Sequence, residues 1–307
     1  MRAVVVDPLS PRKLVLQQVD APQPLPNEAV VRVAAISLNR GEVRGAMNAQ
    51  AGARPGWDIA GTVETGATDG TGPKAGQRVV GMLRTRAWAE QVAVPTTQIA
   101  VLPNGVSFEQ ASTLPVAGLT ALWGLEFAGS LLAQKVLVTG ASGGVGHLAV
   151  QLGIVMGATV VGTVRQDKHA NAVKSAGAAE VIADETAAGA SIFGPYRHVL
   201  DGVGGPTLMN ALRMVSPGGF YVNYGSSAGA ATVDAAALTG TATFYRFSVF
   251  QERKETAASG LARLSQLVAD GKLKPLIDIE APWSEIGSVA QKLIDRTYPG
   301  KAVLRVS

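Results

Sequence analysis

Cysteine is absent from this chain of 307 residues, and histidine occurs only three times. The absence of cysteine excludes a disulfide, a thiolate metal ligand and a cysteine nucleophile. The three histidines, His147, His169 and His198, show no spacing typical of a metal site. Chemistry that needs a protein thiolate is therefore excluded, and no metal centre is expected.

Long apolar runs are also missing, since none approaches the roughly 20 residues that a membrane-spanning helix needs. The first residues, Met-Arg-Ala-Val-Val-Val-Asp, lack the long apolar region and the cleavage site of a secretory signal. We therefore expect a cytoplasmic protein without a membrane partner. Apolar residues still make up 47% of the chain, and its length suits two domains with substantial cores.

The net charge of +4 is dispersed along the chain. The densest basic patches, at 84–86 and 253–254, lack interleaved aromatic residues and match no nucleic-acid-binding module. We expect them to be solvated faces, and we expect no nucleic-acid partner.

A strand, a glycine turn and a helix are predicted in succession over residues 136–146, which read Val-Leu-Val-Thr-Gly-Ala-Ser-Gly-Gly-Val-Gly. Gly140, Gly143 and Gly146 recur at every third position, and apolar residues with helical spacing follow from Gly144. Such glycines let the backbone approach a pyrophosphate, to which the helix N-terminus offers free N–H groups and a partial positive charge. The stretch predicts the phosphate-binding turn of a dinucleotide fold.

The flanking regions predict two kinds of domain. Up to residue 118 the chain is β-rich, whereas strands and helices alternate from residue 135, which is typical of a parallel sheet. We expect residues 44–55 to form a loop beside a cleft and residues 229–240 to form a mobile loop. Early strands are predicted at 2–6, 13–19, 29–36, 57–64, 78–83, 88–94 and 99–102, and later ones at 136–139, 158–164, 180–182, 198–203, 219–224 and 302–306. Helices are predicted at 107–112 and 119–127, from 144, 167 and 205, and at 253–270 and 283–296.

Several motifs in order resemble the medium-chain dehydrogenase/reductase superfamily, in its zinc-independent quinone oxidoreductase (zeta-crystallin-like) branch. Besides the glycine turn, they are Val-Ala-Ala-Ile-Ser-Leu-Asn at 33–39, Pro-Gly-Trp-Asp-Ile-Ala-Gly at 55–61, Leu-Pro-Val-Ala-Gly-Leu-Thr-Ala at 114–121, Asp-Gly-Val-Gly-Gly at 201–205, Gly-Lys-Leu-Lys-Pro at 271–275 and Gly-Lys-Ala-Val-Leu at 300–304. The resemblance implies an α/β protein in which a Rossmann-type domain at 119–252 accompanies a discontinuous β-rich, GroES-like substrate domain at 1–118 and 253–307. It also implies a homodimer.

The predicted cofactor is NADPH. NAD-selective folds carry an acidic residue at the end of the second strand, where this chain has Val164 followed by Arg165 and, three residues on, Lys168. These cations suit a ribose 2′-phosphate, although ordinary surface charges are the alternative and Asp184 would weaken the site if it pointed inward. The turn and the strand ends supply the other expected cofactor contacts, which are Ser142, Gly143, Gly144, Val145, Val203, Tyr224, Gly225 and Ser226.

Metal and nucleophilic catalysis are both disfavoured. The zinc ligands of relatives correspond by resemblance to Asn39, Trp57 and Val116, and the last two cannot bind zinc. A Gly-x-Ser-x-Gly motif at Ser142 would permit a serine hydrolase with Asp184 and His198, but the glycine spacing suits a nucleotide better.

By resemblance, Asn39 and Thr120 lie near the nicotinamide and its ribose, and they are the candidates for a polar contact to the substrate carbonyl. A strand-end cap and a helix hydroxyl bonded to its own backbone are the alternatives. Glu42 is a third candidate catalytic residue, as a polar group beside the cleft. Hydride transfer needs little more than orientation and such a contact.

The predicted function is therefore metal-free, NADPH-dependent reduction of a small-molecule quinone or α,β-unsaturated carbonyl compound. An enoyl-thioester reductase is the alternative enzyme, and a nucleotide-binding sensor or structural protein with little turnover is the alternative outside enzymes.

Overall fold

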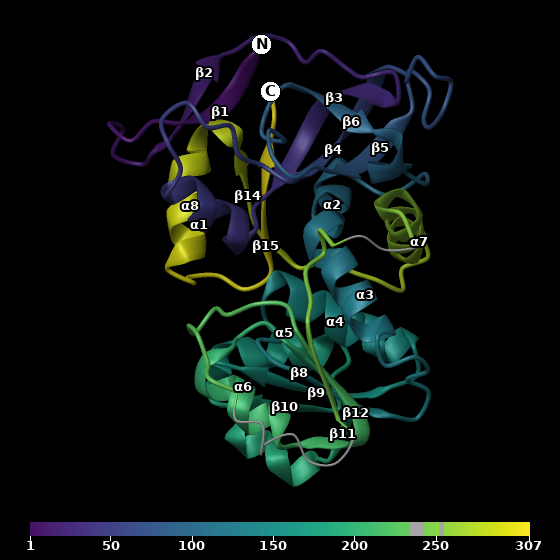
Figure 1. The fold of residues 1–307 in the computed structure, drawn as a ribbon, viewed down its shortest axis with the longest axis vertical. Coiled ribbons are helices and arrows are strands. Elements are labelled where there is room, and N and C mark those ends of the chain that lie inside the picture. Colours follow the sequence, from purple (N-terminus) through teal and green to yellow (C-terminus); the bar gives the residue numbers. More distant parts are fainter. Residues whose placement is uncertain (234–241, 252–254) are drawn as a thin grey trace. The chain divides into compact units, whose positions relative to one another are not determined.

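The structure is a computed structural model that describes residues 1–233, 242–251 and 255–307. It divides into two compact units (Figure 1). Unit 1 comprises Met1–Leu119, Glu252–Gly271 and Pro275–Ser307, and unit 2 comprises Thr120–Gln251 and Lys272–Lys274. Most of the predicted mobile loop at 229–240 and the start of the predicted helix at 253–270 lie outside the described residues.

Unit 2 is built on a six-stranded sheet in which every pairing is parallel, in the order β10-β9-β8-β11-β12-β13. This confirms the predicted Rossmann-type alternation, and its order is that of doubly wound dinucleotide folds. The edge strand β13 (Thr243–Arg246) was not predicted. The other strands are β8 (Lys135–Val138), β9 (Thr159–Val164), β10 (Glu180–Ala183), β11 (Tyr196–Asp201) and β12 (Val215–Asn223).

Helices connect these strands because apolar residues recur with helical spacing between them. Leu137, Val199 and Tyr221 of the sheet form a core with Leu208 and Leu212 of α6. The helices of unit 2 are α3 (Leu119–Glu126), whose first residue belongs to unit 1, α4 (Gly144–Val155), α5 (Ala170–Ser175) and α6 (Gly205–Leu212).

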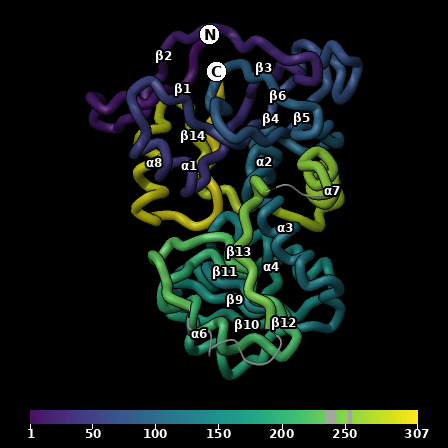
Figure 2. The backbone as a smooth tube through the Cα atoms, in the orientation of Figure 1, coloured from purple at the N-terminus to yellow at the C-terminus, as the bar shows by residue number. Residues whose placement is uncertain are grey.

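Unit 1 contains a seven-stranded, mostly antiparallel sheet and a separate hairpin. The sheet has the order β14-β15-β3-β4-β5-β7, with β6 also paired to β3, and it brings the C-terminal β15 beside β3 (Figure 2). The hairpin is β1 (Arg2–Val6) with β2 (Leu14–Gln18). The sheet strands are β3 (Glu28–Ser37), β4 (Asp58–Thr65), β5 (Arg78–Met82), β6 (Gln91–Pro95), β7 (Ile99–Val101), β14 (Ile277–Pro282) and β15 (Lys301–Arg305).

The helices of unit 1 are α1 (Arg40–Met47), α2 (Phe108–Ser112), α7 (Ala257–Ala269) and α8 (Ile286–Ile294). The predicted cap of α2 is confirmed, because Ser107 Oγ accepts from the Gln110 N–H at 3.1 Å and the Gln110 side chain accepts from the Ser107 N–H. No helix in the described part of the chain combines the length and apolar character needed to cross a membrane.

The prediction of a loop over 44–55 is wrong at its start, because α1 extends to Met47. The helix buries Val43 and Ala46 in the core of unit 1, and the Glu42 side chain accepts a hydrogen bond from the N–H of Asn39 at 2.6 Å. Burial and capping thus outweigh the low helix propensity of Gly41 and Gly45, which had obscured the period.

Because of His198, we predict that the free energy of unfolding of unit 2 decreases in acid. Its ring is fully buried in β11, and burial lowers its pKa to about 3. Since the unfolded chain binds this proton near pH 6.5, the stability from a neutral His198 is present above that pH and is lost as the pH falls from 6.5 towards 3. We expect a slope of about 1.4 kcal/mol per pH unit from this residue.

Thermal unfolding between pH 7 and pH 4 measures this slope, which His198→Leu should reduce. His169→Gln, on the partly exposed His169, should leave it unchanged. Equal slopes in the wild type and His198→Leu would contradict the prediction.

Candidate functional site

The glycine turn of unit 2 joins β8 to α4 at the carboxyl end of a central strand. Gly140 has φ +60°, a value that favours glycine, and its carbonyl accepts from the Gly143 N–H at 3.0 Å. Gly143 is exposed, and the N–H groups of Gly144 and Val145 begin a helix in which the first donors have no intrahelical acceptor. The turn therefore presents free donors of the kind that bind a phosphate. Ser142 lies partly exposed on the same turn.

Gly146 sets how closely α4 packs on this turn. A Cβ atom at this position would lie 2.4 Å from the Gly140 carbonyl oxygen and 2.7 Å from Ala141 Cα. At Gly143 the nearest atom would be the same Gly140 oxygen at 3.4 Å, which is ordinary contact. The two glycines therefore have different roles: Gly146 permits close helix packing, and Gly143 lies at the exposed tip.

Asp201 ties together the carboxyl ends of three neighbouring strands. Its carboxylate accepts from Thr139 Oγ1 at 2.5 Å, from the Val203 N–H at 2.9 Å and from Asn223 Nδ2 at 2.7 Å. The Gly204 N–H adds two longer bonds of 3.2 and 3.3 Å. This buried network holds the loops at the ligand-binding edge of a parallel sheet.

The loops after β11 and β12 are bonded to each other. The Ala228 N–H donates to the Val203 carbonyl at 2.7 Å, and a Cβ on Gly202 would lie 2.4 Å from the Tyr224 ring. Burial first, and then the charge of Asp201, raise the pKa of Tyr224, which keeps its hydroxyl protonated. Four predicted cofactor contacts lie on these loops: Val203, Tyr224, Gly225 and Ser226.

Arg165 and Lys168 are both exposed just beyond the carboxyl end of β9. Asp184 is engaged elsewhere, since its Oδ1 accepts from the Thr186 N–H at 2.8 Å and its Oδ2 from the Gly189 N–H at 2.9 Å. Its carboxylate thus caps its own turn after β10.

A buried polar cluster lies in unit 1, formed by Ser37, Asn39, Glu42, Asp58 and Lys301. Asp58 is fully buried and accepts from Ser37 Oγ at 2.8 Å, Asn39 Nδ2 at 2.6 Å and the Val116 N–H at 3.0 Å. The Lys301 ammonium, only 4% exposed, lies 3.4 Å from its Oδ2. One buried positive charge therefore faces one buried carboxylate.

Both the nitrogen and the oxygen of the Asn39 side-chain amide form hydrogen bonds within this cluster. Its Nδ2 donates to Glu42 Oε1 at 3.0 Å and to Asp58 Oδ2, while its Oδ1 accepts from Lys301 Nζ at 2.6 Å. Lys301 also donates to the Leu38 carbonyl at 2.9 Å. Both amide hydrogens of Asn39 are thus engaged, so its partly exposed side chain can offer a ligand an acceptor and not a donor.

Glu42 is buried beside these groups, and its Oε2 has no hydrogen-bond partner. Burial first, and then the charge of Asp58, raise its pKa well above the usual value. A protonated Glu42 leaves the charges of Asp58 and Lys301 to balance each other. The structure therefore brings the predicted residues Asn39 and Glu42 into direct contact.

Because of Glu42, we predict that the protein loses part of its free energy of unfolding as the solution becomes alkaline. Because its folded pKa lies above the unfolded value of 4.5, its contribution is fully present below pH 4.5 and is lost as the pH rises through the folded pKa. Glu42→Gln keeps an acceptor for Asn39 without the titration, so it should remove this part of the slope. Urea unfolding from pH 4.5 to 9 measures the slope, and a variant with the wild-type profile would contradict the assignment.

Thr120 belongs to unit 2, at the start of α3, and is 5% exposed. Within the described residues its hydroxyl makes no side-chain hydrogen bond, so the predicted alternative of a bond to its own backbone is not seen.

Asp58 and Lys301 were not predicted from the sequence as members of the polar cluster. Both residues lie in motifs that resemble the family, at 55–61 and 300–304, and only this membership could have pointed to them.

Zinc does not fit the positions that hold it in zinc-dependent relatives. Trp57 and Val116 carry no metal-binding atom, and the Val116 N–H is bonded to Asp58. Across the described ranges, no group of three or more acidic or histidine side chains could hold a metal ion.

Two family models match the chain, the alcohol dehydrogenase GroES-like domain over residues 25–104 and the zinc-binding dehydrogenase over residues 144–265. A chloroplast envelope quinone oxidoreductase homolog of Arabidopsis thaliana is 30% identical, over 94% of this chain and 92% of that protein. A 2-methylene-furan-3-one reductase of Solanum lycopersicum is 31% identical over 75% of this chain and 57% of that protein.

Among solved structures, Escherichia coli quinone oxidoreductase complexed with NADPH is similar with a TM-score of 0.85 and 26% identity, over 99% of this chain and 100% of that one. The parallel nucleotide-binding sheet and the β-rich unit together define a medium-chain dehydrogenase or reductase. The chain belongs to the medium-chain dehydrogenase/reductase superfamily, in its quinone oxidoreductase branch.

Proposed function

We propose that the protein is an NADPH-dependent, metal-free reductase of quinones or α,β-unsaturated carbonyl compounds. The observation that carries this proposal is the glycine turn, where Gly146 lets α4 pack against Gly140 at the carboxyl end of a central parallel strand. Similarity to quinone oxidoreductases and to an enone reductase supports the reaction class.

Unit 2 carries the residues that would hold the cofactor. The free N–H groups of Gly144 and Val145 suit the pyrophosphate, and Arg165 and Lys168 suit the 2′-phosphate. The loops that Asp201 fixes suit the remaining contacts. NADPH, when bound, supplies the hydride, and the protein orients it and excludes competing reactions.

The polar residues divide their roles by hydrogen-bond chemistry. The Thr120 hydroxyl has no other side-chain partner in the described structure, so it can donate to a carbonyl oxygen on which negative charge develops. Asn39 can only accept, which suits a hydroxyl or amide N–H of a ligand. Glu42 positions Asn39 by accepting hydrogen bonds from its backbone and side-chain N–H groups, and it does not itself contact the substrate.

The double variant Arg165→Ala/Lys168→Ala tests whether these two cations set the preference for NADPH over NADH. Removing both cations should weaken NADPH binding by about tenfold or more and leave NADH binding within about twofold, because charge-assisted contacts to the 2′-phosphate are lost. Fluorescence titration of both nucleotides measures this, with the exposed Lys74→Ala of unit 1 as control. An equal loss for both nucleotides would contradict the assignment.

The function itself is tested by following NADPH absorbance with 1,4-benzoquinone and with a simple enone. Oxidation with either acceptor supports the reductase, and a Thr120→Val variant should then lower kcat more than NADPH affinity. Tight NADPH binding without oxidation by any acceptor would overturn the proposal in favour of a nucleotide sensor. Part of the proposal is a cytoplasmic homodimer, which light scattering and cell fractionation test.

A further inference from the structure

Two guanidinium groups that have no carboxylate partner within the described residues lie on two bonded segments of unit 1, one of which precedes Asp58. Arg54 is partly buried and lies four residues before Asp58, and Arg86 is exposed on the adjoining segment. Neither side chain forms an ion pair or a hydrogen bond with a carboxylate in the described part of the chain. The sequence had suggested only a solvated face here.

Backbone bonds hold the two arginines together. The Arg86 N–H donates to the Arg54 carbonyl at 2.9 Å, and Thr85 Oγ1 donates to the same carbonyl at 2.6 Å. The Ala87 N–H donates to the Gly56 carbonyl at 3.2 Å, which continues the pairing of the two segments. Arg86 itself has φ +66°, a left-handed conformation that costs free energy for a residue with a Cβ atom.

The Arg54 guanidinium carries a further cost. Its Nε is inaccessible to solvent and has no hydrogen-bond partner. Burial first, and then the charge of Arg86, lower the pKa of Arg54, so the cation is destabilised by its surroundings. The unpartnered Nε of Arg54 and the left-handed backbone of Arg86 occur on two residues that are bonded through their backbones. An anion bound there would give the buried donor an acceptor and offset the repulsion between the two cations.

We propose that Arg54 and Arg86 form an anion subsite that binds a carboxylate or phosphate group of the substrate. Paired guanidinium groups match the planar, multi-oxygen geometry of both anions. The proposal rests on the proposed function, because it names a feature of the substrate that the enzyme reduces. Four residues of chain span at most about 14 Å, so the backbone of Arg54 lies within that distance of the backbone of Asp58 and its polar cluster.

Two matched substrate pairs test the subsite with NADPH at low ionic strength. (E)-4-oxopent-2-enoate against its methyl ester isolates a carboxylate, and the crotonyl thioester of 4′-phosphopantetheine against that of pantetheine isolates a phosphate group. We expect kcat/KM to favour the charged member of one pair by about tenfold or more. The pair that shows this preference identifies the anion.

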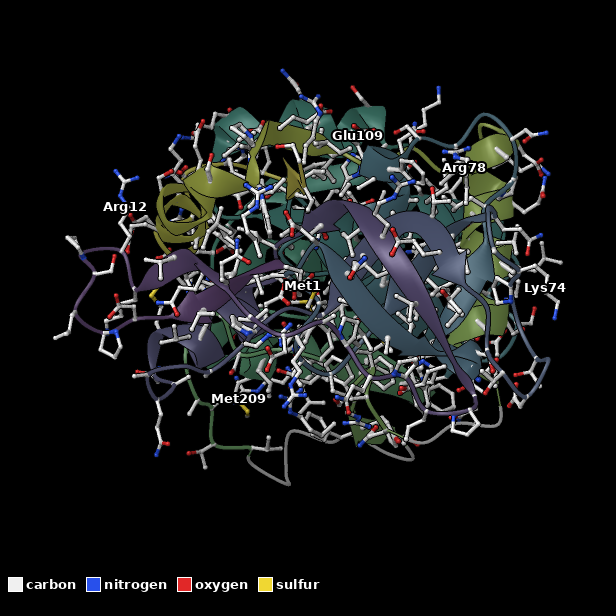
Figure 3. All side chains as sticks on the ribbon, turned by 90° about the horizontal axis from the view of Figure 1, so that it is seen from above. Met1, Arg12, Lys74, Arg78, Glu109 and Met209 are labelled. Carbon is white, nitrogen blue, oxygen red and sulfur yellow. The ribbon has the colours of Figure 1, made fainter. Side chains whose placement is uncertain are left out.

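Arg86→Gln and Arg54→Met should each abolish most of this preference and leave the neutral member within about twofold. Arg86→Gln is the safer variant because Arg86 is exposed, and thermal unfolding checks that Arg54→Met remains folded. Arg12→Gln is the matched control, since Arg12 lies in the same unit and extends away from the ribbon into solvent (Figure 3). Equal rates for charged and neutral members in the wild type would overturn the subsite and leave the reductase proposal intact.

Calorimetry with inorganic phosphate and with succinate gives a readout that does not need turnover. Binding that Arg86→Gln weakens by about tenfold supports the subsite even if no acceptor oxidises NADPH, in which case only the reductase proposal fails. Binding that is the same in the wild type, Arg86→Gln and Arg54→Met overturns the subsite.

Discussion

Asp58→Asn should lower the free energy of unfolding of unit 1 by about 3–5 kcal/mol, because it leaves a buried ammonium group without its opposite charge. Lys301 is only 4% exposed and has no other carboxylate within bonding distance among the described residues. In the wild type, Ser37, Asn39 and Val116 donate hydrogen bonds to Asp58. The NH₂ group of the new asparagine would face at least one of these donors and could not accept its hydrogen. Urea unfolding at pH 7 measures the loss.

Two further variants separate the stranded charge from other effects. Asp58→Asn/Lys301→Met removes both charges, so it should recover part of the stability that Asp58→Asn loses. Glu64→Gln breaks an exposed pair with Arg32, 3.7 Å apart, and should cost at most about 1 kcal/mol. A loss below about 1 kcal/mol in Asp58→Asn would show that Asp58 and Lys301 do not depend on each other.

Gly146→Ala should lower NADPH affinity by about tenfold to a hundredfold and destabilise unit 2 by about 1–3 kcal/mol. The added Cβ would lie 2.4 Å from one backbone atom and 2.7 Å from another, and backbone cannot rotate out of the way as a flexible side chain can. The N-terminus of α4 must therefore move from the turn, and its free N–H groups move with it. Fluorescence titration with NADPH and thermal unfolding measure the two effects.

Gly143→Ala is the matched control for folding. It adds the same atom to the same turn, but at 3.4 Å from the nearest atom and at φ −81°, where alanine is unstrained. Its stability should stay within about 0.5 kcal/mol of the wild type. Unchanged NADPH affinity in Gly146→Ala would show that close packing of α4 on the turn is not needed for binding.

The strands and helices were largely readable from local pattern. The alternating β-rich segments, the capped helix at Ser107 and the strand–turn–helix around Gly140 depend on neighbouring residues, and they are found where predicted. The two missed strands, β13 and β14, obtain their pairing from strands elsewhere in the chain. Helix α1 as a whole was missed because Gly41 and Gly45 weaken the helical period, whereas burial of Val43 supplies its stability.

By itself, the sequence determined the class of fold, the position of the glycine turn between β8 and α4 and the absence of any cysteine chemistry, since each depends on residue type and short-range spacing. The tertiary structure alone decided that Asn39 presents an acceptor, because its orientation is set by Lys301, 262 positions away, and by Asp58, 19 positions away. It likewise decided that Arg54 and Arg86 are joined by a backbone hydrogen bond while neither has a carboxylate partner among the described residues. The physical reason is that hydrogen bonds and charges act over a few ångströms in space, whatever the separation along the chain.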